Sequence, residues 1–169
     1  RCCRRAAWGP VGCGFANLNR GEGAVQLDNE PVLLLARCVS VNGNGVLICG
    51  AAGSGKSSLA LNLIALGAEL VADDQTLIRR ENKNLIARCP ETISHLIEAR
   101  GLGILTPPTR SDVALTLVVD LETVQSQRVP LPEAYELFGI TLPLFRRAPL
   151  DAFPAALYIL ARDGMRYDV

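Results

Sequence analysis

The stretch from Gly50 to Ser57, "GAAGSGKS", constrains the fold of this chain more than any other feature. Its glycines, lysine and serine have the spacing of a Walker A loop, and it lies between an apolar run and a segment of helical periodicity. Glycine permits the backbone conformations that turn successive N–H groups inward as an anion nest, at the positive end of the following helix. The sequence therefore predicts a strand, a phosphate-binding loop and a helix, in that order.

Individual residues of this loop have predicted roles. Lys56 is expected to neutralise the terminal phosphates of a nucleotide, and the Ser57 hydroxyl to join the shell of a Mg²⁺ ion that bridges them. A glycine-rich turn that happens to carry a lysine is the alternative, and the flanking strand and helix patterns argue against it. The residues expected to hold the phosphates are Gly50, Ala51, Ala52, Gly53, Ser54, Gly55, Lys56, Ser57 and Ser58.

Short apolar runs and turn signals surround the loop. Val32–Val41 and Val46–Cys49 are predicted strands, joined by the Asn-Gly signal of a tight hairpin at Asn42–Gly45. Apolar residues at helical spacing then predict a helix of about three turns that ends at Gly67. A short buried strand is expected over Ala68–Ala72.

Strand patterns dominate the rest of the chain. A hairpin is predicted over Thr76–Cys89, a strand over Ala114–Leu121, and two strands on either side of Phe138-Gly139. The segment Asp151–Arg162 is predicted to be a closing helix with Asp151 as its N-cap. Predicted strands outnumber predicted helices, so we expect an α/β fold with a mixed β-sheet and flanking helices.

Composition narrows the class of protein. The chain has 169 residues, 49% of them hydrophobic, which predicts one domain over residues 31–169. Residues 1–30 lack periodicity and are expected to form a disordered tail. Seventeen basic and seventeen acidic residues cancel, which argues against nucleic acid or a membrane surface as the main partner. The six cysteines show no Cys-x-x-Cys pairing, and no transmembrane or signal segment stands out, so a cytoplasmic location is expected.

Two places could supply the acidic partner of the magnesium. Asp73 and Asp74 follow the predicted strand at Ala68–Ala72, and repulsion within such a pair raises one pKa while a metal lowers the other. One carboxylate can then hold metal while the other accepts a proton. Asp120, after "LTLVV", has the form of a Walker B aspartate. The pair is favoured, and Asp120 remains the alternative.

Three motifs in order carry a resemblance to a known family: the Walker A loop, "LVADD" at Leu70–Asp74, and "EARGLGI" at Glu98–Ile104. Over roughly Val32 to Ala161 the chain resembles the catalytic domain of HPr kinase/phosphorylase, in a short form without the separate N-terminal domain. The resemblance implies a P-loop kinase domain of the HPr kinase/PEP carboxykinase-like type. Members phosphorylate a serine of the phosphocarrier HPr with ATP and Mg²⁺, regulating a bacterial phosphotransferase system. Many also reverse the reaction with inorganic phosphate, which gives pyrophosphate.

The resemblance also implies roles for residues of this chain. Asp73 is expected to be the base that takes the seryl proton, and Arg100 to stabilise charge on the transferring phosphoryl group together with Lys56. Ser57, Asp74 and Glu98 are expected to contact Mg²⁺. An HPr-like phosphocarrier is the expected protein partner, and a hexamer the expected assembly.

Several interpretations remain open at this level. Leu35 stands where the family places a histidine near the aspartates, so steps that use an imidazole, phosphorolysis above all, do not follow from the resemblance. The chain's one histidine, His95, is not assigned to the site. The loop Pro107–Ser111 is either a contact for protein partners or a plain surface connection. A nucleotide-sensing module without transfer activity, and a metabolite kinase that uses Asp120, are the alternative functions.

Overall fold

The computed structural model describes residues 30–90 and 96–165, and these form a mixed α/β fold. Eleven strands and two helices lie in the described ranges. In chain order they are β1 (Val32–Leu34), β2 (Arg37–Val41), β3 (Asn44–Cys49), α1 (Lys56–Ala65), β4 (Glu69–Ala72), β5 (Thr76–Glu81), β6 (Asn84–Arg88), β7 (Ile97–Ala99), β8 (Gly103–Leu105), β9 (Asp112–Val124), β10 (Glu133–Leu137), β11 (Ile140–Arg147) and α2 (Phe153–Asp163).

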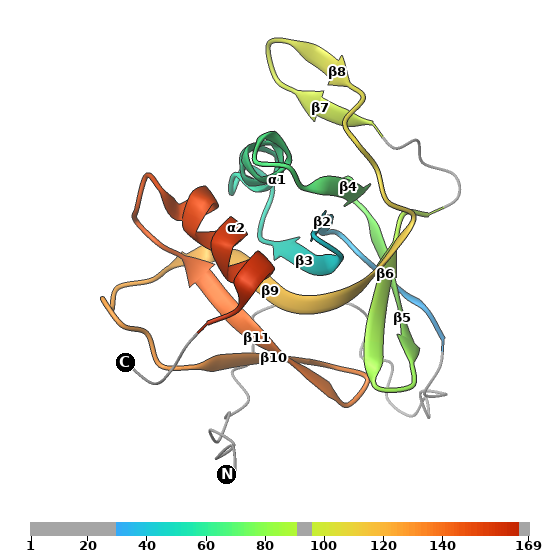
Figure 1. The fold of residues 1–169 in the computed structure, drawn as a ribbon, viewed down its shortest axis with the longest axis vertical. Helices are drawn as coiled ribbons and strands as arrows, with labels where there is room; N and C mark the ends of the chain where they lie inside the picture. The colour runs from blue at the N-terminus through green and yellow to red at the C-terminus, as the bar shows by residue number, and fades with distance from the viewer. Residues whose placement is uncertain (1–29, 91–95, 166–169) are drawn as a thin grey trace.

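Nine of the strands form one sheet in the order β1-β5-β6-β9-β3-β2-β4, with β11 also paired to β9 and β10 paired to β11. The 13-residue strand β9 organises this sheet, because it pairs antiparallel with β6 near its start and parallel with both β3 and β11 farther along. The hairpin β7–β8 is a separate sheet that projects from the body beyond α1 and β4 (Figure 1). The helices α1 and α2 lie on the same face of the large sheet (Figure 1).

The two faces of the sheet bury separate apolar cores, because alternate strand residues point to opposite sides. The core under the helices includes Val39, Ile48, Leu63, Val119 and Leu157. The core on the other face includes Cys38, Leu47, Ile78, Val118 and Leu144. The central strands are therefore covered on both sides, which explains why every residue of β2 is buried and why β3 and β9 contain continuous apolar runs.

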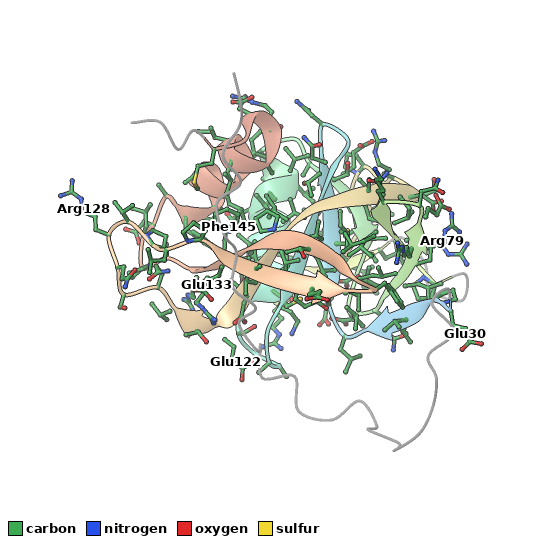
Figure 2. All side chains as sticks on the ribbon, turned by 90° about the horizontal axis from the view of Figure 1, so that it is seen from below. Glu30, Arg79, Glu122, Arg128, Glu133 and Phe145 are labelled. Atoms are coloured by element: carbon green, nitrogen blue, oxygen red, sulfur yellow. The ribbon has the colours of Figure 1, made fainter. Side chains whose placement is uncertain are left out.

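Charged side chains such as Arg79 and Arg128 lie at opposite ends of the molecule (Figure 2).

The hairpin and the helix around the loop confirm the local predictions. Asn42 and Gly43 have φ values of 50° and 84° at the turn between β2 and β3, where Val41 pairs with Asn44. At the end of α1, Gly67 has φ 109° and the Ala68 N–H donates to the Leu63 carbonyl at 3.0 Å. This is the Schellman geometry that a glycine allows at a helix end.

The predicted strand Val32–Val41 is wrong as a single element. The chain pairs with β5 up to Leu34, bends at Leu35 and Ala36, and pairs with β3 from Arg37. The bend is fixed by a distant residue, because the Thr76 hydroxyl donates to the buried Ala36 carbonyl oxygen at 2.7 Å. One apolar run therefore forms two strands, β1 and β2, at different positions in the sheet.

The predicted cap of the closing helix is also wrong. The N-cap of α2 is Ala152 rather than Asp151, and within the described residues no side chain donates or accepts a capping hydrogen bond there. The Phe153 N–H instead donates to the Leu150 carbonyl at 2.9 Å, and Pro154 in the first turn has no N–H that needs a partner. The first turn of α2 therefore has little need of a carboxylate cap.

The edge of β4 is covered by the segment that follows β8. The Leu70 N–H donates to the Pro108 carbonyl at 2.8 Å, and the Arg110 N–H donates to the Leu70 carbonyl at 2.9 Å. The stiff loop predicted at Pro107–Ser111 thus runs alongside an edge strand.

None of the helices in the described ranges is long and apolar enough to cross a membrane.

Candidate active site

Three strand ends meet at one edge of the large sheet. Strand β2 pairs antiparallel with both β3 and β4, so β3 and β4 run in the same direction on either side of it. The phosphate-binding loop leaves the end of β3, Asp73 leaves the end of β4, and β2 begins between them at Arg37. Strand pairing alone therefore brings a glycine-rich loop, a pair of carboxylates and a guanidinium together.

The phosphate-binding loop has the backbone of an anion nest. Gly50, Gly53 and Gly55 have φ values of 139°, 80° and 98°. A Cβ atom at Gly50 would lie 2.6 Å from the Ser54 Oγ and 3.3 Å from the Leu121 Cβ, so a side chain at this position would have to displace its neighbours. Helix α1 begins at Lys56, and in this described segment neither a side-chain cap nor an acidic first-turn residue competes for its N–H groups. Those donors and the helix dipole are available to an anion.

Lys56 braces the same loop. Its Nζ donates hydrogen bonds to the Gly50 carbonyl oxygen at 2.7 Å and to the Ala51 carbonyl oxygen at 2.9 Å. The ammonium group is thereby held beside the nest, where it adds a full positive charge to the partial charges of the N–H groups. The loop and the lysine together form a cationic surface suited to phosphate.

Most of the predicted site residues line one cavity of about 480 Å³. From the predicted site, the lining residues are Ala52, Gly53, Gly55, Lys56, Ser57, Ser58, Asp74, Glu98 and Arg100. Gly50, Ala51, Ser54 and Asp73 belong to the same neighbourhood but are not on the cavity wall. The hairpin β7–β8 contributes Glu98 and Arg100, and its Ile97 is buried in the core with α1, which anchors the hairpin over the loop.

Sequence reasoning missed Arg37, which also lines this cavity. Its Nη2 lies 2.7 Å from the Asp74 Oδ1, and its Nη1 contacts the Asp73 carboxylate. The Arg37 side chain is only 6% exposed, that of Asp73 13%, and that of Asp74 74%. Burial lowers the pKa of Arg37 from its ordinary value, and the carboxylates of Asp74 and Glu98 oppose that change. The sequence signal that could have revealed Arg37 is a charged residue at the start of a predicted buried strand.

Comparisons with known proteins give the family. The model of the HPr Serine kinase C-terminal domain matches residues 30–133. The chain belongs to the HPr serine kinase C-terminal domain family. The HPr kinase/phosphorylase of Halalkalibacterium halodurans is 40% identical over 121 residues, which are 67% of this chain and 37% of the relative. That of Bacillus subtilis is 46% identical over 92 residues, which are 50% of this chain and 30% of the relative.

A solved structure shares the fold of this chain. The Hpr(Ser) kinase/phosphatase from Coxiella burnetii superposes with a TM-score of 0.65 at 27% sequence identity, and the match covers 76% of this chain and 93% of that one. The predicted fold class, a P-loop kinase domain of the HPr kinase type with a mixed sheet and flanking helices, is confirmed. The chain spans little more than a third of the length of the Halalkalibacterium relative.

Asp120 has a position unlike that of the aspartate pair. It is level with Cys49 in the parallel register of β3 and β9, but it shares a strand face with Val118, on the side of the sheet away from the helices. Its carboxylate is buried and accepts a hydrogen bond from the Arg146 Nη1 at 3.0 Å and one from the Glu122 N–H at 2.9 Å. Asp120 is not among the residues lining the 480 Å³ cavity.

The oxygen donors on the cavity wall fit a hard divalent cation. Ser57 offers a hydroxyl, and Asp74 and Glu98 offer carboxylates. Mg²⁺ binds proteins through one or two carboxylates together with substrate phosphates. Within the described residues, no three His, Cys, Asp or Glu side chains are grouped closely enough to hold a metal by themselves. The arrangement suits a metal whose shell is completed by phosphate oxygens.

Leu35, which the sequence resemblance places at the position of a family histidine, lies at the bend between β1 and β2 and is 74% exposed. His95 and the tail expected over residues 1–30 lie outside the described residues, apart from Glu30.

Proposed function

We propose that this domain transfers the γ-phosphoryl group of ATP to a serine of an HPr-type phosphocarrier protein. The observation that carries the proposal is the single cavity that contains the phosphate-binding loop, Lys56, Asp74, Glu98 and Arg100. Membership of the HPr serine kinase family, and relatives named HPr kinase/phosphorylase, support the choice of acceptor.

The loop would hold the β- and γ-phosphates against the backbone N–H groups and the Lys56 ammonium. A second cavity of about 420 Å³ lies on the other side of the loop and shares Gly53, Gly55 and Ser58 with the first. Its wall combines apolar groups such as Phe153 with the polar side chain of Asn62. We assign the nucleoside to this second cavity, which leaves the carboxylate-lined cavity for the acceptor.

In the forward reaction, the seryl oxygen attacks the γ-phosphorus, the bond to the bridging oxygen breaks, and ADP leaves. We assign the seryl proton to Asp73, whose carboxylate must turn from Arg37 toward the cavity to receive it. Ser57, Asp74 and Glu98 would hold Mg²⁺, which neutralises charge on the phosphates when bound. Arg100 would stabilise the charge that spreads over the transferring group.

In the reverse reaction, an oxygen of inorganic phosphate attacks the seryl-phosphate, which releases the seryl hydroxyl and gives pyrophosphate. The same loop can hold both phosphates of the product. Leu35 offers no proton to this direction, so we propose kinase activity as the main activity and phosphorolysis as the weaker one.

The proposed acceptor implies a cytoplasmic enzyme. We also propose a homo-oligomeric assembly, a hexamer as the resemblance implies, whose mass light scattering on a sizing column would measure.

A transfer assay tests the function directly. Purified domain, Mg²⁺ and labelled ATP are incubated with a purified HPr-type protein, and the modified residue is located by mass spectrometry. We expect one phosphoserine, and its loss on addition of inorganic phosphate with formation of pyrophosphate would reveal the reverse reaction. Nucleotide binding without any phosphoserine would instead support a regulatory module.

A further inference from the structure

Arg37 occupies an unusual position for a charged side chain. It begins strand β2 between the loop end of β3 and the carboxylate end of β4, and its side chain is 6% exposed. It contacts Asp73 with one terminal nitrogen and Asp74, at 2.7 Å, with the other. The two neighbouring carboxylates therefore share one guanidinium.

This contact changes what the aspartate pair can bind. Two adjacent ionised carboxylates repel each other, and a cation between them relieves the repulsion. The guanidinium supplies that cation through its fixed fork of N–H donors. With Arg37 in place the pair carries one net negative charge instead of two, and the affinity of an oxygen site for a divalent cation depends on the number of charged ligands.

The two carboxylates differ in how easily they can exchange this partner. Asp74 is 74% exposed and lines the cavity, whereas Asp73 is 13% exposed and lies behind Arg37. A cation arriving through the cavity reaches Asp74 first. Phosphate oxygens held by the loop would supply the further ligands that Asp74 and Glu98 cannot provide alone.

We propose that Arg37 is a positioning residue: its guanidinium lies between Asp73 and Asp74 and takes the role that a divalent cation would otherwise have there. The metal therefore binds this site only together with a nucleoside triphosphate. The inference rests on the proposed function. On binding of the metal–triphosphate complex, Asp74 exchanges Arg37 for the metal, and Asp73 keeps its contact with the guanidinium until it turns toward the acceptor serine.

Metal binding in the absence of nucleotide tests this proposal independently of catalysis. Mn²⁺ is titrated into the protein and free Mn²⁺ is followed by electron paramagnetic resonance. We expect weak binding by the wild-type protein, at least about tenfold tighter binding by Arg37→Gln and Arg37→Met, and wild-type behaviour in Arg37→Lys, which restores a cation. Adding Asp74→Asn to Arg37→Gln should remove the gain. Tight Mn²⁺ binding by the wild-type protein without nucleotide, or no gain in either neutral variant, would overturn the proposal.

A measurement on the unaltered protein covers the case in which Arg37 variants do not fold. The guanidinium N–H resonances of Arg37 should keep their positions when millimolar Mg²⁺ is added alone and move when Mg²⁺ and a non-hydrolysable ATP analogue are added together. A shift with Mg²⁺ alone contradicts the proposal. If the analogue does not bind at all, the proposed function fails, and the response to Mg²⁺ alone still decides whether Arg37 keeps the metal out.

Discussion

Lys56 Nζ donates a hydrogen bond to the Gly50 carbonyl oxygen at 2.7 Å, so the lysine of the phosphate-binding loop closes that loop on itself. The first and the seventh residue of the motif are thereby held together in the ligand-free protein. The charge that would neutralise phosphate also maintains the shape of the nest, which links the fold of the loop to its chemistry.

Replacing Lys56 by alanine should remove phosphoryl transfer, because both the charge at the nest and the brace to Gly50 are lost. We expect transfer to fall by at least about a hundredfold, the scale seen for a lost charge-stabilising donor. The labelled-ATP assay measures it. Lys83→Ala, in the exposed turn between β5 and β6, is the matched control and should leave transfer unchanged. Undiminished transfer in Lys56→Ala would refute the role given to the loop.

Gly50→Ala should be more harmful than Gly53→Ala, although both glycines have positive φ. A Cβ atom at Gly50 meets the Ser54 Oγ at 2.6 Å and the Leu121 Cβ at 3.3 Å, whereas none of the described atoms lies within 4 Å of one at Gly53. We expect Gly53→Ala to lower the free energy of unfolding by about 1 kcal/mol through backbone strain alone, and Gly50→Ala to lower it further. Urea denaturation measures both, and equal losses would contradict the steric argument.

Changes at Asp74 and at Asp120 should affect different properties, phosphoryl transfer in the first case and stability in the second. Asp74→Asn should abolish transfer with little change in stability, because the side chain is 74% exposed on the cavity wall. Asp120→Asn should lower the free energy of unfolding by about 1–3 kcal/mol, because it weakens a buried contact with Arg146, and the folded variant should still transfer. Denaturation and transfer assays on both variants measure this. The reverse pattern would make Asp120 the metal ligand and favour the metabolite kinase.

A bulky residue in the second cavity should separate nucleoside binding from phosphate binding. Asn62 is exposed on α1 and lines that cavity, so Asn62→Trp should weaken ATP binding about tenfold or more while pyrophosphate still binds. Calorimetry with the two ligands measures this. Ala65→Trp, exposed on the same helix but not on the cavity wall, is the control. Unchanged ATP affinity in Asn62→Trp would place the nucleoside elsewhere.

The buried thiol of Cys38 should make stability depend on alkaline pH. Burial raises the pKa of Cys38 from its ordinary value of 9.0, with a further contribution from Cys49. The unfolded chain therefore loses this proton first as the pH rises, and the folded state is destabilised by up to about 1.4 kcal/mol per pH unit above the unfolded pKa. Below that pKa the contribution is constant.

The comparison with Cys38→Ala isolates this effect. Between about pH 8 and pH 10 the wild-type free energy of unfolding should fall more steeply than that of the variant. In the folded protein at about pH 8, mass spectrometry should find Cys38 unmodified by iodoacetamide, since the thiolate is the reactive form. Parallel pH curves for the two proteins would contradict the prediction.

The motif Gly50–Ser57 and the elements next to it could be predicted from the sequence, because each depends on a few neighbouring residues. The turn at Asn42-Gly43 and the stop of α1 at Gly67 need only local backbone preferences and hydrogen bonds. The Walker A motif and the aspartate pair led to seven of the nine predicted residues now found on one cavity wall, and the family resemblance added Glu98 and Arg100. The predicted cap of α2 and the predicted extent of the first strand were wrong. In α2 a main-chain carbonyl accepts the hydrogen bond expected of the cap, and in the first strand the distant Thr76 bonds to the backbone at the bend.

What the sequence determined by itself is the local chemistry: a phosphate nest, a cation beside it and a pair of carboxylates at a strand end. The tertiary structure alone decided that Arg37 meets Asp73 and Asp74, residues 36 and 37 positions away, and that Asp120 pairs with Arg146 on the opposite face. Such contacts follow from which strands pair and which side each residue faces. The pairing and the register of the strands are those that minimise the free energy of the whole sheet and its two cores, and no short stretch of sequence encodes them.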